Sequence, residues 1–363
     1  TMTPNSPTTE TINWTSFNMQ QDCATVATDQ GIRVFNLNPL SEALHLTQEQ
    51  VGSVRIAHLL HRSNLIALVS GGARPKYAEN TLMLWDDKKK ACVFECAIYG
   101  GPILNVFMNS SRLVLVQAKR IHIFGLQPFV TLRAEETGVN LAGIAAMGGE
   151  SYSAVLAFPS FKQGSVQLVA LENVTSEKSL APTVVAAHQG DIAALAVSSQ
   201  GTLLATGSAK GTLIRIFDTR TRTMLNELRR GFDPSTLHCL TFSPCGTFVA
   251  VSSDKATVHI FRTREKQEWN RKNIYDDSVR NMSKFQVPAD TIAKLAFVQE
   301  ESDGEASTNQ INMICAPFQS VVAITSNGQY RRFSFNKDGH SECKAFDYIL
   351  QLGSEQDFWL SAV

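Results

Sequence analysis

The residues best suited to chemistry are two adjacent arginines, Arg229 and Arg230, in the tetrapeptide Leu228-Arg229-Arg230-Gly231. A guanidinium is always charged and can donate two parallel hydrogen bonds, which suits the oxygens of a phosphate. Side chains alternate along a strand, so neighbouring arginines there point to opposite sides. Gly231 allows the backbone to turn and to approach a neighbour closely. The dipeptide can therefore serve two separate anion pockets.

A repeat of 45 residues surrounds the arginines and provides hydroxyl and ammonium groups. The pattern Ser198-x-x-Gly-Thr-x-x-Ala-x-x-Ser-x-Lys-x-Thr212 recurs from Ser243 to Thr257, with seven identities at one offset. The corresponding residues are Ser208 with Ser253, Lys210 with Lys255, and Thr212 with Thr257. We interpret these sets as two phosphate cradles of similar design. The alternative is that the hydroxyls only close turns and that each arginine pairs with a carboxylate.

The segment from Thr263 to Ser283 mixes basic residues with apolar and aromatic ones. The side chains that could enter a lipid interface are Trp269, Ile274, Tyr275 and Met282. The bases would meet anionic headgroups, each contributing roughly 1 kcal/mol. Carboxylates in the same segment weaken this attraction; they belong to Glu265, Glu268, Asp276 and Asp277. The alternative is an ordinary insertion whose aromatic residues pack back on the protein.

The elements that must position these residues are β-strands. Short β-branched and aromatic runs recur between Gly, Asn, Asp and Ser clusters, and no long amphipathic helix is apparent. One type of strand occurs seven times, ending at Phe35, Trp85, Phe124, Val169, Phe217, Phe261 and Phe333. The intervals are 50, 39, 45, 48, 44 and 72 residues. A period near 45 residues with several strands per unit is typical of propeller blades.

We therefore predict an all-β fold, a seven-bladed β-propeller with four antiparallel strands per blade. Each blade can bury its faces only against its neighbours, so the ring must close. The last strand-like run, Ala345–Leu350, follows the seventh repeated strand. We expect it to complete the last blade from contiguous sequence. Leu228–Gly231 should then lie on the outermost strand of blade five or at its end.

The predicted organisation is one propeller over residues 12–350 with four additional segments. These are a disordered N-terminal segment at 1–11, a long membrane-facing loop of blade six at 263–283, a disordered acidic insertion at 300–310 and a C-terminal tail at 351–363. No run approaches 18 apolar residues, and residues 1–11 lack the parts of a signal peptide. Any membrane contact is therefore expected to be peripheral.

Charge narrows the possible functions. Lys and Arg number 33 and Asp and Glu number 33, so a net charge of zero gives no global attraction to nucleic acid. Between Gly201 and Lys284, however, 14 Lys and Arg stand against 8 Asp and Glu. This positive sector contains the paired arginines and indicates an anion-facing patch. The alternative is an ordinary solvated face.

Patterns typical of enzymes and metal sites are weak. The sequence has no Gly-x-Ser-x-Gly, no His-Glu-x-x-His and no phosphate-binding loop that ends in Lys-Ser or Lys-Thr. Its seven cysteines show no disulfide framework, which fits a reducing compartment. Cys92 and Cys96 lack the second pair or histidine cluster that zinc would need. We expect no enzymatic activity, no metal and no cofactor.

With these motifs, the chain resembles the PROPPIN family of phosphoinositide-binding propellers, which includes the WIPI proteins of autophagy. The family's hallmark is Phe/Leu-Arg-Arg-Gly after blade five, and Leu228–Gly231 matches it. Other matching segments are Lys210–Asp218, Asp254–Phe261, Gln50–Ser53 and Leu60–Leu68. The likeness spans about residues 13–350. The leucine variant, followed by Asp233-Pro-Ser-Thr, is most similar to the animal subgroup engaged with the autophagic lipid-transfer protein.

The resemblance implies two sites at the propeller rim for phosphatidylinositol 3-phosphate and phosphatidylinositol 3,5-bisphosphate. Site one would use Arg229 with His188, Ser208, Lys210 and Thr212. Site two would use Arg230 with Thr236, Ser252, Ser253, Lys255, Thr257 and Arg262. The resemblance also implies that the long loop of blade six dips into the bilayer.

The implied function is that of a non-enzymatic effector that recruits autophagy machinery as autophagosomes form. The chain would be a cytoplasmic monomer, peripherally associated with preautophagosomal and endosomal membranes. Its expected protein partner is the autophagic lipid-transfer protein, contacted through blades two and three, including Pro75–Asn80. One alternative is a scaffold propeller that binds only proteins. The other is a propeller enzyme with carboxylates or histidines converging at the central channel.

Overall fold

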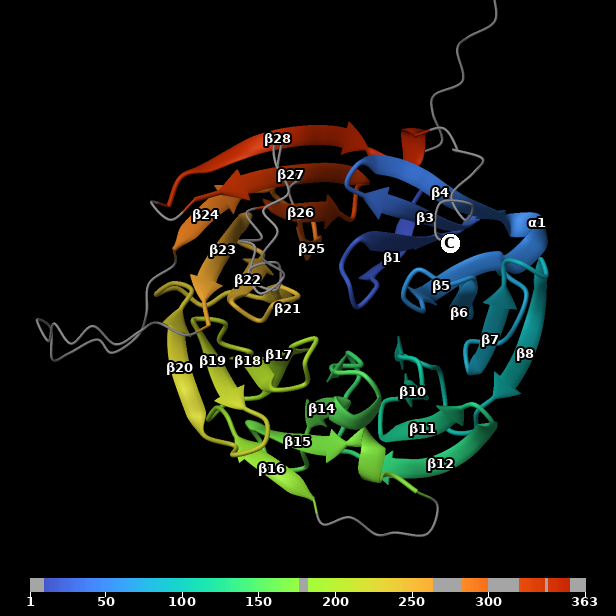
Figure 1. Cartoon of the computed structure of the whole chain (residues 1–363), viewed down its shortest axis with the longest axis horizontal. Coiled ribbons are helices and arrows are strands. Elements are labelled where there is room, and N and C mark those ends of the chain that lie inside the picture. Colours follow the sequence, from blue (N-terminus) through green and yellow to red (C-terminus); the bar gives the residue numbers. More distant parts are fainter. Residues whose placement is uncertain (1–9, 176–181, 264–281, 300–319, 337–338, 353–363) are drawn as a thin grey trace, which may run out of the picture.

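The computed structural model is a ring of seven β-sheets around a central axis (Figure 1). It describes residues 10–175, 182–263, 282–299, 320–336 and 339–352. Within these residues every sheet has four strands, and neighbouring strands are antiparallel. The predicted seven-bladed propeller is confirmed.

The first three blades occupy the N-terminal part of the ring. Blade one contains β1 (Ile12–Phe17), β2 (Cys23–Thr28), β3 (Gly31–Leu37) and β4 (Leu40–Thr47), and the short helix α1 (Gln48–Val51) follows it. Blade two contains β5 (Gly52–Leu59), β6 (Leu65–Pro75), β7 (Thr81–Asp86) and β8 (Ala91–Ala97). Blade three contains β9 (Asn105–Met108), β10 (Arg112–Val116), β11 (Arg120–Leu126) and β12 (Phe129–Glu136).

Blades four and five continue the ring. Blade four contains β13 (Ala146–Gly148), β14 (Val155–Pro159), β15 (Ser165–Ala170) and β16 (Thr183–Ala186), with the 3₁₀ turns η1 (Ser151–Ser153) and η2 (Leu171–Asn173). Blade five contains β17 (Ile192–Val197), β18 (Leu203–Ser208), β19 (Leu213–Asp218) and β20 (Met224–Arg229).

Blades six and seven close the ring. Blade six contains β21 (Leu237–Phe242), β22 (Phe248–Ser253), β23 (Thr257–Arg262) and β24 (Ser283–Gln286). Blade seven contains β25 (Ala293–Val298), β26 (Ser320–Thr325), β27 (Gln329–Phe335) and β28 (Ser341–Tyr348), followed by the 3₁₀ turn η4 (Ile349–Gln351). Blade seven thus consists of four consecutive strands, as predicted from the contiguous C-terminal sequence.

The seven strands recognised from their spacing are all third strands of blades. They are β3, β7, β11, β15, β19, β23 and β27. In all seven sheets neighbouring strands follow one another in chain order, and Figure 1 shows the fourth strand at the outer edge of the ring. Arginines at the end of the fourth strand therefore lie at the rim.

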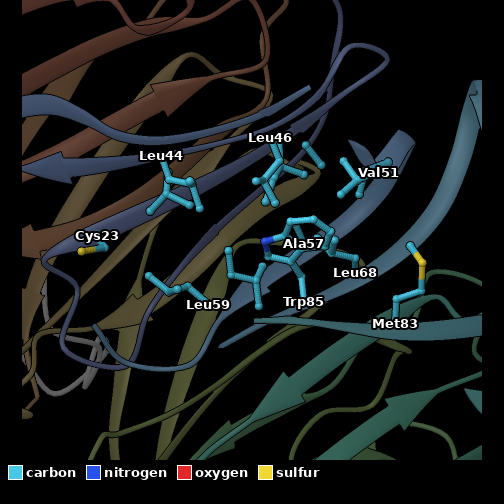
Figure 2. Close-up of a cluster of buried hydrophobic side chains, with 14 residues drawn as sticks. Cys23, Leu44, Leu46, Val51, Ala57, Leu59, Leu68, Met83 and Trp85 are labelled. Atoms are coloured by element: carbon cyan, nitrogen blue, oxygen red, sulfur yellow. The ribbon is translucent and has the colours of Figure 1, made fainter. Parts of the chain in front are cut away.

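The core lies between blades rather than within any one of them. Second strands such as β2, β18, β22 and β26 are buried along their whole length, because neighbouring blades cover both faces. One buried cluster joins Cys23, Leu44 and Leu46 of blade one to Leu68 and Trp85 of blade two (Figure 2). Each such cluster is shielded from water only when the two adjacent blades are both in place, which is why the ring closes.

Several sequence predictions concern segments outside the seven sheets. Most of the predicted N-terminal segment, the blade-six loop, the acidic insertion and the C-terminal tail lie outside the described residues. Among the described residues, no helix has the length and apolar character needed to cross a membrane. The same residues contain no group of three His, Cys, Asp or Glu side chains placed to hold a metal ion.

Candidate anion-binding site at the junction of blades five and six

The paired arginines are positioned by the outermost strand of blade five, β20, as predicted. Leu228 lies opposite Ile214 of β19 and is 0% exposed, because it belongs to the cluster that joins blades five and six. Arg229 ends the strand, and the chain then leaves the sheet. The backbone N–H groups of Arg230 and Gly231 both donate to the carbonyl of Thr212, at 2.9 and 3.3 Å. The buried leucine and this carbonyl hold both arginines at the rim.

The two guanidinium groups make different contacts. Arg230 is 7% exposed, and its Nε donates to the Gly211 carbonyl at 2.8 Å while its Nη2 donates to the Asp233 carbonyl. Burial lowers the pKa of Arg230, and the nearby charge of Asp254 opposes that shift. Arg229 is half-buried, with its guanidinium 5.2 Å from the ring centre of Phe232.

Arg230 is a buried cation whose charge is not matched by an ion pair. Its hydrogen-bond partners are backbone carbonyls, and no carboxylate of the described residues forms a salt bridge with it. A buried guanidinium is costly unless it is paired with an opposite charge. The alternative that each arginine pairs with a carboxylate therefore fails for Arg230 within the described residues. An anionic ligand would supply the missing charge.

The blade-five set surrounds the turn from Ser208 to Thr212. Ser208 and Thr212 are nearly buried, whereas Lys210 is exposed. Gly211 has a φ of +65°, and a Cβ there would lie 1.9 Å from the carbonyl oxygen of Ser235. Glycine is therefore required where this turn meets the chain that enters blade six. The Ser235 N–H donates to the Lys210 carbonyl at 3.1 Å and fixes the same contact.

His188 lies behind this turn. Its ring Nε2 lies 2.9 Å from the hydroxyl of Thr206, and its backbone N–H donates to the Gly164 carbonyl. Burial, followed by the positive charge of Arg215, lowers the pKa of His188 to about 4. Arg215 itself pairs with Glu227 at 2.8 Å. The sequence interpretation missed this pair, which is created by the register that sets the two residues opposite each other in β19 and β20.

The blade-six set lies around the turn from Ser253 to Thr257. Ser252 and Ser253 are buried, and the hydroxyl of Ser252 donates to the Ala293 carbonyl of blade seven at 2.7 Å. Lys255 is exposed, and the Thr257 hydroxyl donates to the Lys255 carbonyl at 3.2 Å. The exposed Thr236 joins this group because its carbonyl accepts the Asp254 N–H.

Arg262 is the one predicted member of site two that the structure places elsewhere. It ends β23 and lies opposite Phe248, whereas Thr257 begins the same strand. Five residues of strand separate the two by about 17 Å. The sequence position of Arg262 suggested a neighbour of the arginine pair, but the direction of β23 carries it to the opposite end of the blade.

Two histidines that sequence reasoning did not select lie on strands β21 and β23 of blade six. The Nδ1 atoms of His238 and His259 are buried and have no hydrogen-bond partner among the described residues. Burial, together with the charges of Arg230 and Lys284, lowers the pKa of His259 to about 4. His259 faces Lys284 across the β23–β24 pair. The unpartnered Nδ1 atoms of His238 and His259 could hydrogen-bond to an anionic ligand.

The two turns are not equivalent, contrary to the prediction from the repeat. In blade five Gly207 pairs with Ile214, whereas in blade six Ser252 pairs with Val258, so the second turn is one residue shorter. The Arg230 N–H bonds to the Thr212 carbonyl, but the corresponding N–H of Val287 bonds to the carbonyl of Ala256. Thr257 therefore corresponds to Leu213, and the predicted equivalence of the two threonines is wrong.

The predicted membrane loop can be judged at one of its four residues. Trp269, Ile274 and Tyr275 lie outside the described residues. Met282 is half-buried, packs against the cluster of blades six and seven, and donates its N–H to the Ile260 carbonyl at 2.8 Å. Met282 therefore contacts the core at the approach to β24, and lipid insertion of the loop stays a prediction.

Comparisons with known proteins bear on the family of this chain. The family model for PROPPIN matches residues 13–289, which span blades one to six. Ectopic P granules protein 6 of Caenorhabditis elegans is 33% identical over 97% of this chain and 91% of its own length. SVP1-like protein 2 of Pichia angusta is 36% identical over 68% of both chains.

Solved structures share the fold. Hsv2 of Kluyveromyces lactis superposes with a TM-score of 0.74 at 22% identity, covering 94% of this chain and 99% of that one. A complex of KlAtg21 with the coiled coil of AgAtg16 matches with a TM-score of 0.73 at 19% identity, covering 93% and 99%. Phosphoinositide binding is the role of the family to which the matching model belongs. On the family model and on the relatives over most of its length, the chain belongs to the PROPPIN family of β-propellers.

Proposed function

We propose that this chain is a non-enzymatic effector that binds phosphatidylinositol 3-phosphate and phosphatidylinositol 3,5-bisphosphate through two rim sites around Arg229 and Arg230. The observation that carries the proposal is the environment of Arg230. This guanidinium is nearly buried, is held by two backbone carbonyls and lacks an ion pair within the described chain. A phosphate group would satisfy its charge and remaining N–H groups bidentately.

The first site is formed by Arg229 with the blade-five turn. The hydroxyls of Ser208 and Thr212, the ammonium of Lys210 and the imidazole of His188 come from elements that meet there. Arg215 is already paired with Glu227, so Arg229 and Lys210 supply the positive charge that this site would offer to a headgroup. This composition suits one phosphorylated headgroup.

The second site is formed by Arg230 with the blade-six turn. Ser253, Lys255 and Thr257 come from that turn, and His259 lies beside Arg230 and opposite Lys284. Two modest sites on one rim act together, since binding at the first raises the effective concentration of lipid at the second. The chain would therefore select membranes that are rich in the lipid.

Membrane binding at one edge leaves the other blades accessible to protein partners. We propose that blades two and three hold the autophagic lipid-transfer protein and so recruit autophagy machinery to preautophagosomal and endosomal membranes. Support comes from β6, which continues to Pro75 although its pairing with β7 ends at Val69, so that residues 72–75 are exposed. The Atg21 neighbour is likewise seen with a coiled-coil partner.

Flotation with phosphatidylinositol 3-phosphate liposomes tests the proposal. The double variant Arg229→Thr, Arg230→Thr should stay at the bottom of the gradient, while its circular dichroism and thermal unfolding show a folded propeller. A folded double variant that still floats would refute the rim sites. Wild-type protein with no phosphoinositide preference would favour the protein-only scaffold instead.

A further inference from the structure

An exposed aromatic side chain stands directly beside the paired arginines. Phe232 is 77% exposed and lies in the short connection between β20 and β21, two residues after Arg230. The positively charged guanidinium of Arg229 lies 5.2 Å from the centre of its ring. A cation at this distance from a ring makes a cation–π contact, and a large apolar surface remains in water.

The loop that carries Phe232 is anchored on both sides. Before it, the Gly231 N–H donates to the Thr212 carbonyl; after it, the Ser235 N–H donates to the Lys210 carbonyl. Across the loop, Arg230 donates to the carbonyl of Asp233. The ring is thus presented by a connection tied to the turn that forms the first proposed lipid site.

The surroundings of Phe232 are cationic. In the turns and strand ends on this side of blades five and six, the cations are Lys210, Arg229, Arg230 and Lys255, and the carboxylates are Asp233 and Asp254. An exposed ring among such cations matches an anionic lipid interface, where aromatic rings and bases lie together.

A second exposed apolar group provides a comparison. Val139, Leu141 and Phe161 line a cavity of about 270 Å³ at blade four, which also reaches the start of blade five. Phe161 is 70% exposed, close to the value for Phe232. This cavity is also lined by Lys162 and Asp191, so its charges are balanced and nothing in the structure indicates an occupant. Phe161 therefore serves as a matched control.

We propose that Phe232 is a membrane anchor that enters the interface of an anionic phospholipid bilayer next to Arg229. This inference rests on the proposed function, since the two lipid sites bring the rim to the membrane. Arg229 contacts a lipid headgroup while the adjacent ring of Phe232 passes from water into the bilayer interface. Phe232 thereby adds affinity for the bilayer that the soluble headgroup alone would not reveal.

The test compares vesicles with a soluble headgroup. The vesicles contain phosphatidylcholine, phosphatidylserine and phosphatidylinositol 3-phosphate, and the soluble probe is inositol 1,3-bisphosphate. Phe232→Ala should weaken vesicle binding about tenfold, as expected for losing part of a buried phenyl group. It should leave binding of the soluble probe unchanged. Phe161→Ala should change neither.

Phe232→Leu separates insertion from positioning of Arg229. Leucine keeps an apolar side chain but removes the ring on which Arg229 lies, so it should restore most of the vesicle binding. If Phe232→Ala weakens both probes equally, or if Phe232→Leu fails to restore binding, the ring acts on Arg229 and the anchor is refuted. Unchanged vesicle binding by Phe232→Ala refutes it as well. Failure of the rim sites themselves is distinguishable, because wild-type protein would then bind neither probe.

A direct depth measurement completes the test. Phe232→Trp and Phe161→Trp are each compared with wild type on vesicles whose acyl chains carry bromine. Only the tryptophan at 232 should add fluorescence that bromine quenches, and only when phosphatidylinositol 3-phosphate is present. Equal quenching at both positions, or none at 232, would overturn the anchor.

Discussion

Blades five and six share a sequence repeat, yet they use one corresponding position in opposite ways. In blade five the third strand carries Arg215, which faces Glu227 of the outer strand and pairs with it at 2.8 Å. In blade six the third strand carries His259, which faces Lys284. Blade five neutralises the charge at this position internally, whereas blade six gathers positive charge around Arg230. A repeat can thus conserve the backbone of a turn while its two copies acquire different electrostatics.

The largest expected effect concerns the turns themselves. Gly211 and Ala256 both have positive φ, +65° and +54°, and a Cβ at Gly211 would lie 1.9 Å from the carbonyl oxygen of Ser235. Gly211→Ala would place a Cβ against the Ser235 carbonyl and should lower the free energy of unfolding by about 3 kcal/mol. Ala256→Gly should raise it by about 0.5 kcal/mol through relief of strain. Urea unfolding measures both, and equal effects would show that the turns are interchangeable.

Leu228 is expected to matter next, because it fixes the arginines through the core between the two blades. Leu228→Ala empties a fully buried position and should cost about 3 kcal/mol. Leu225→Ala on the same strand is the control; this residue is 42% exposed and should change stability by less than about 0.5 kcal/mol. Similar midpoints for the two variants would contradict the role of Leu228 as an inter-blade anchor.

Much of this architecture could be predicted because it depends on local pattern. The spacing of the third strands identified all seven blades, and the tetrapeptide Leu228–Gly231 lies where that spacing placed it. The cross-strand partners could not be predicted, since they depend on which backbone groups pair. One residue fewer in the blade-six turn shifts Thr257 relative to Thr212. The sequence carried one sign of that shift, since the third strands of blades five and six end 44 residues apart while the repeat has an offset of 45.

Long-range placement explains the remaining misses. Arg262 looked close to site two, but strand direction carries it to the far end of blade six. His238 and His259 were not among the predicted site residues, and only their unpartnered, buried Nδ1 atoms, within the described residues, point to a ligand. Met282 was predicted to belong to a membrane loop, and it contacts the core at the approach to β24. Composition is a poor guide to such positions because burial is decided by neighbouring blades.

The histidines give both blades a dependence on pH. The pKa of His188 and that of His259 fall from the ordinary 6.5 to about 4, chiefly through burial. The unfolded chain therefore takes up these protons at higher pH than the folded chain does. Stability should be greatest above pH 6.5 and should fall as the pH drops toward 4, by on the order of 1 kcal/mol per histidine after solvent screening.

Substitution assigns this dependence. His188→Gln and His259→Gln should each reduce the slope of unfolding free energy against pH between 6.5 and 4. The slope should not vanish, because burial also lowers the pKa of His58 to about 4. Thermal unfolding across that range is the measurement. A slope that neither substitution changes would show that these imidazoles are not neutral in the folded protein.

The smallest effects come from the charges that distinguish the blades. Glu227→Gln releases Arg215 from its carboxylate and should strengthen binding to phosphatidylinositol 3-phosphate vesicles by up to about fivefold. Lys284→Gln should weaken binding by a similar factor. Both changes should disappear at high salt, since the screening length falls to about 3 Å at 1 M. Co-sedimentation at two salt concentrations checks this, and changes of equal sign would erase the contrast between the blades.

The central claim is that two arginines side by side in the sequence serve two separate sites. Titration calorimetry with a short-chain, water-soluble phosphatidylinositol 3-phosphate measures the number of sites directly. The account predicts two ligands per wild-type chain, one per chain for folded Arg229→Ala and for folded Arg230→Ala, and none for the double variant. A single ligand per wild-type chain, or complete loss of binding on either single substitution, would contradict it.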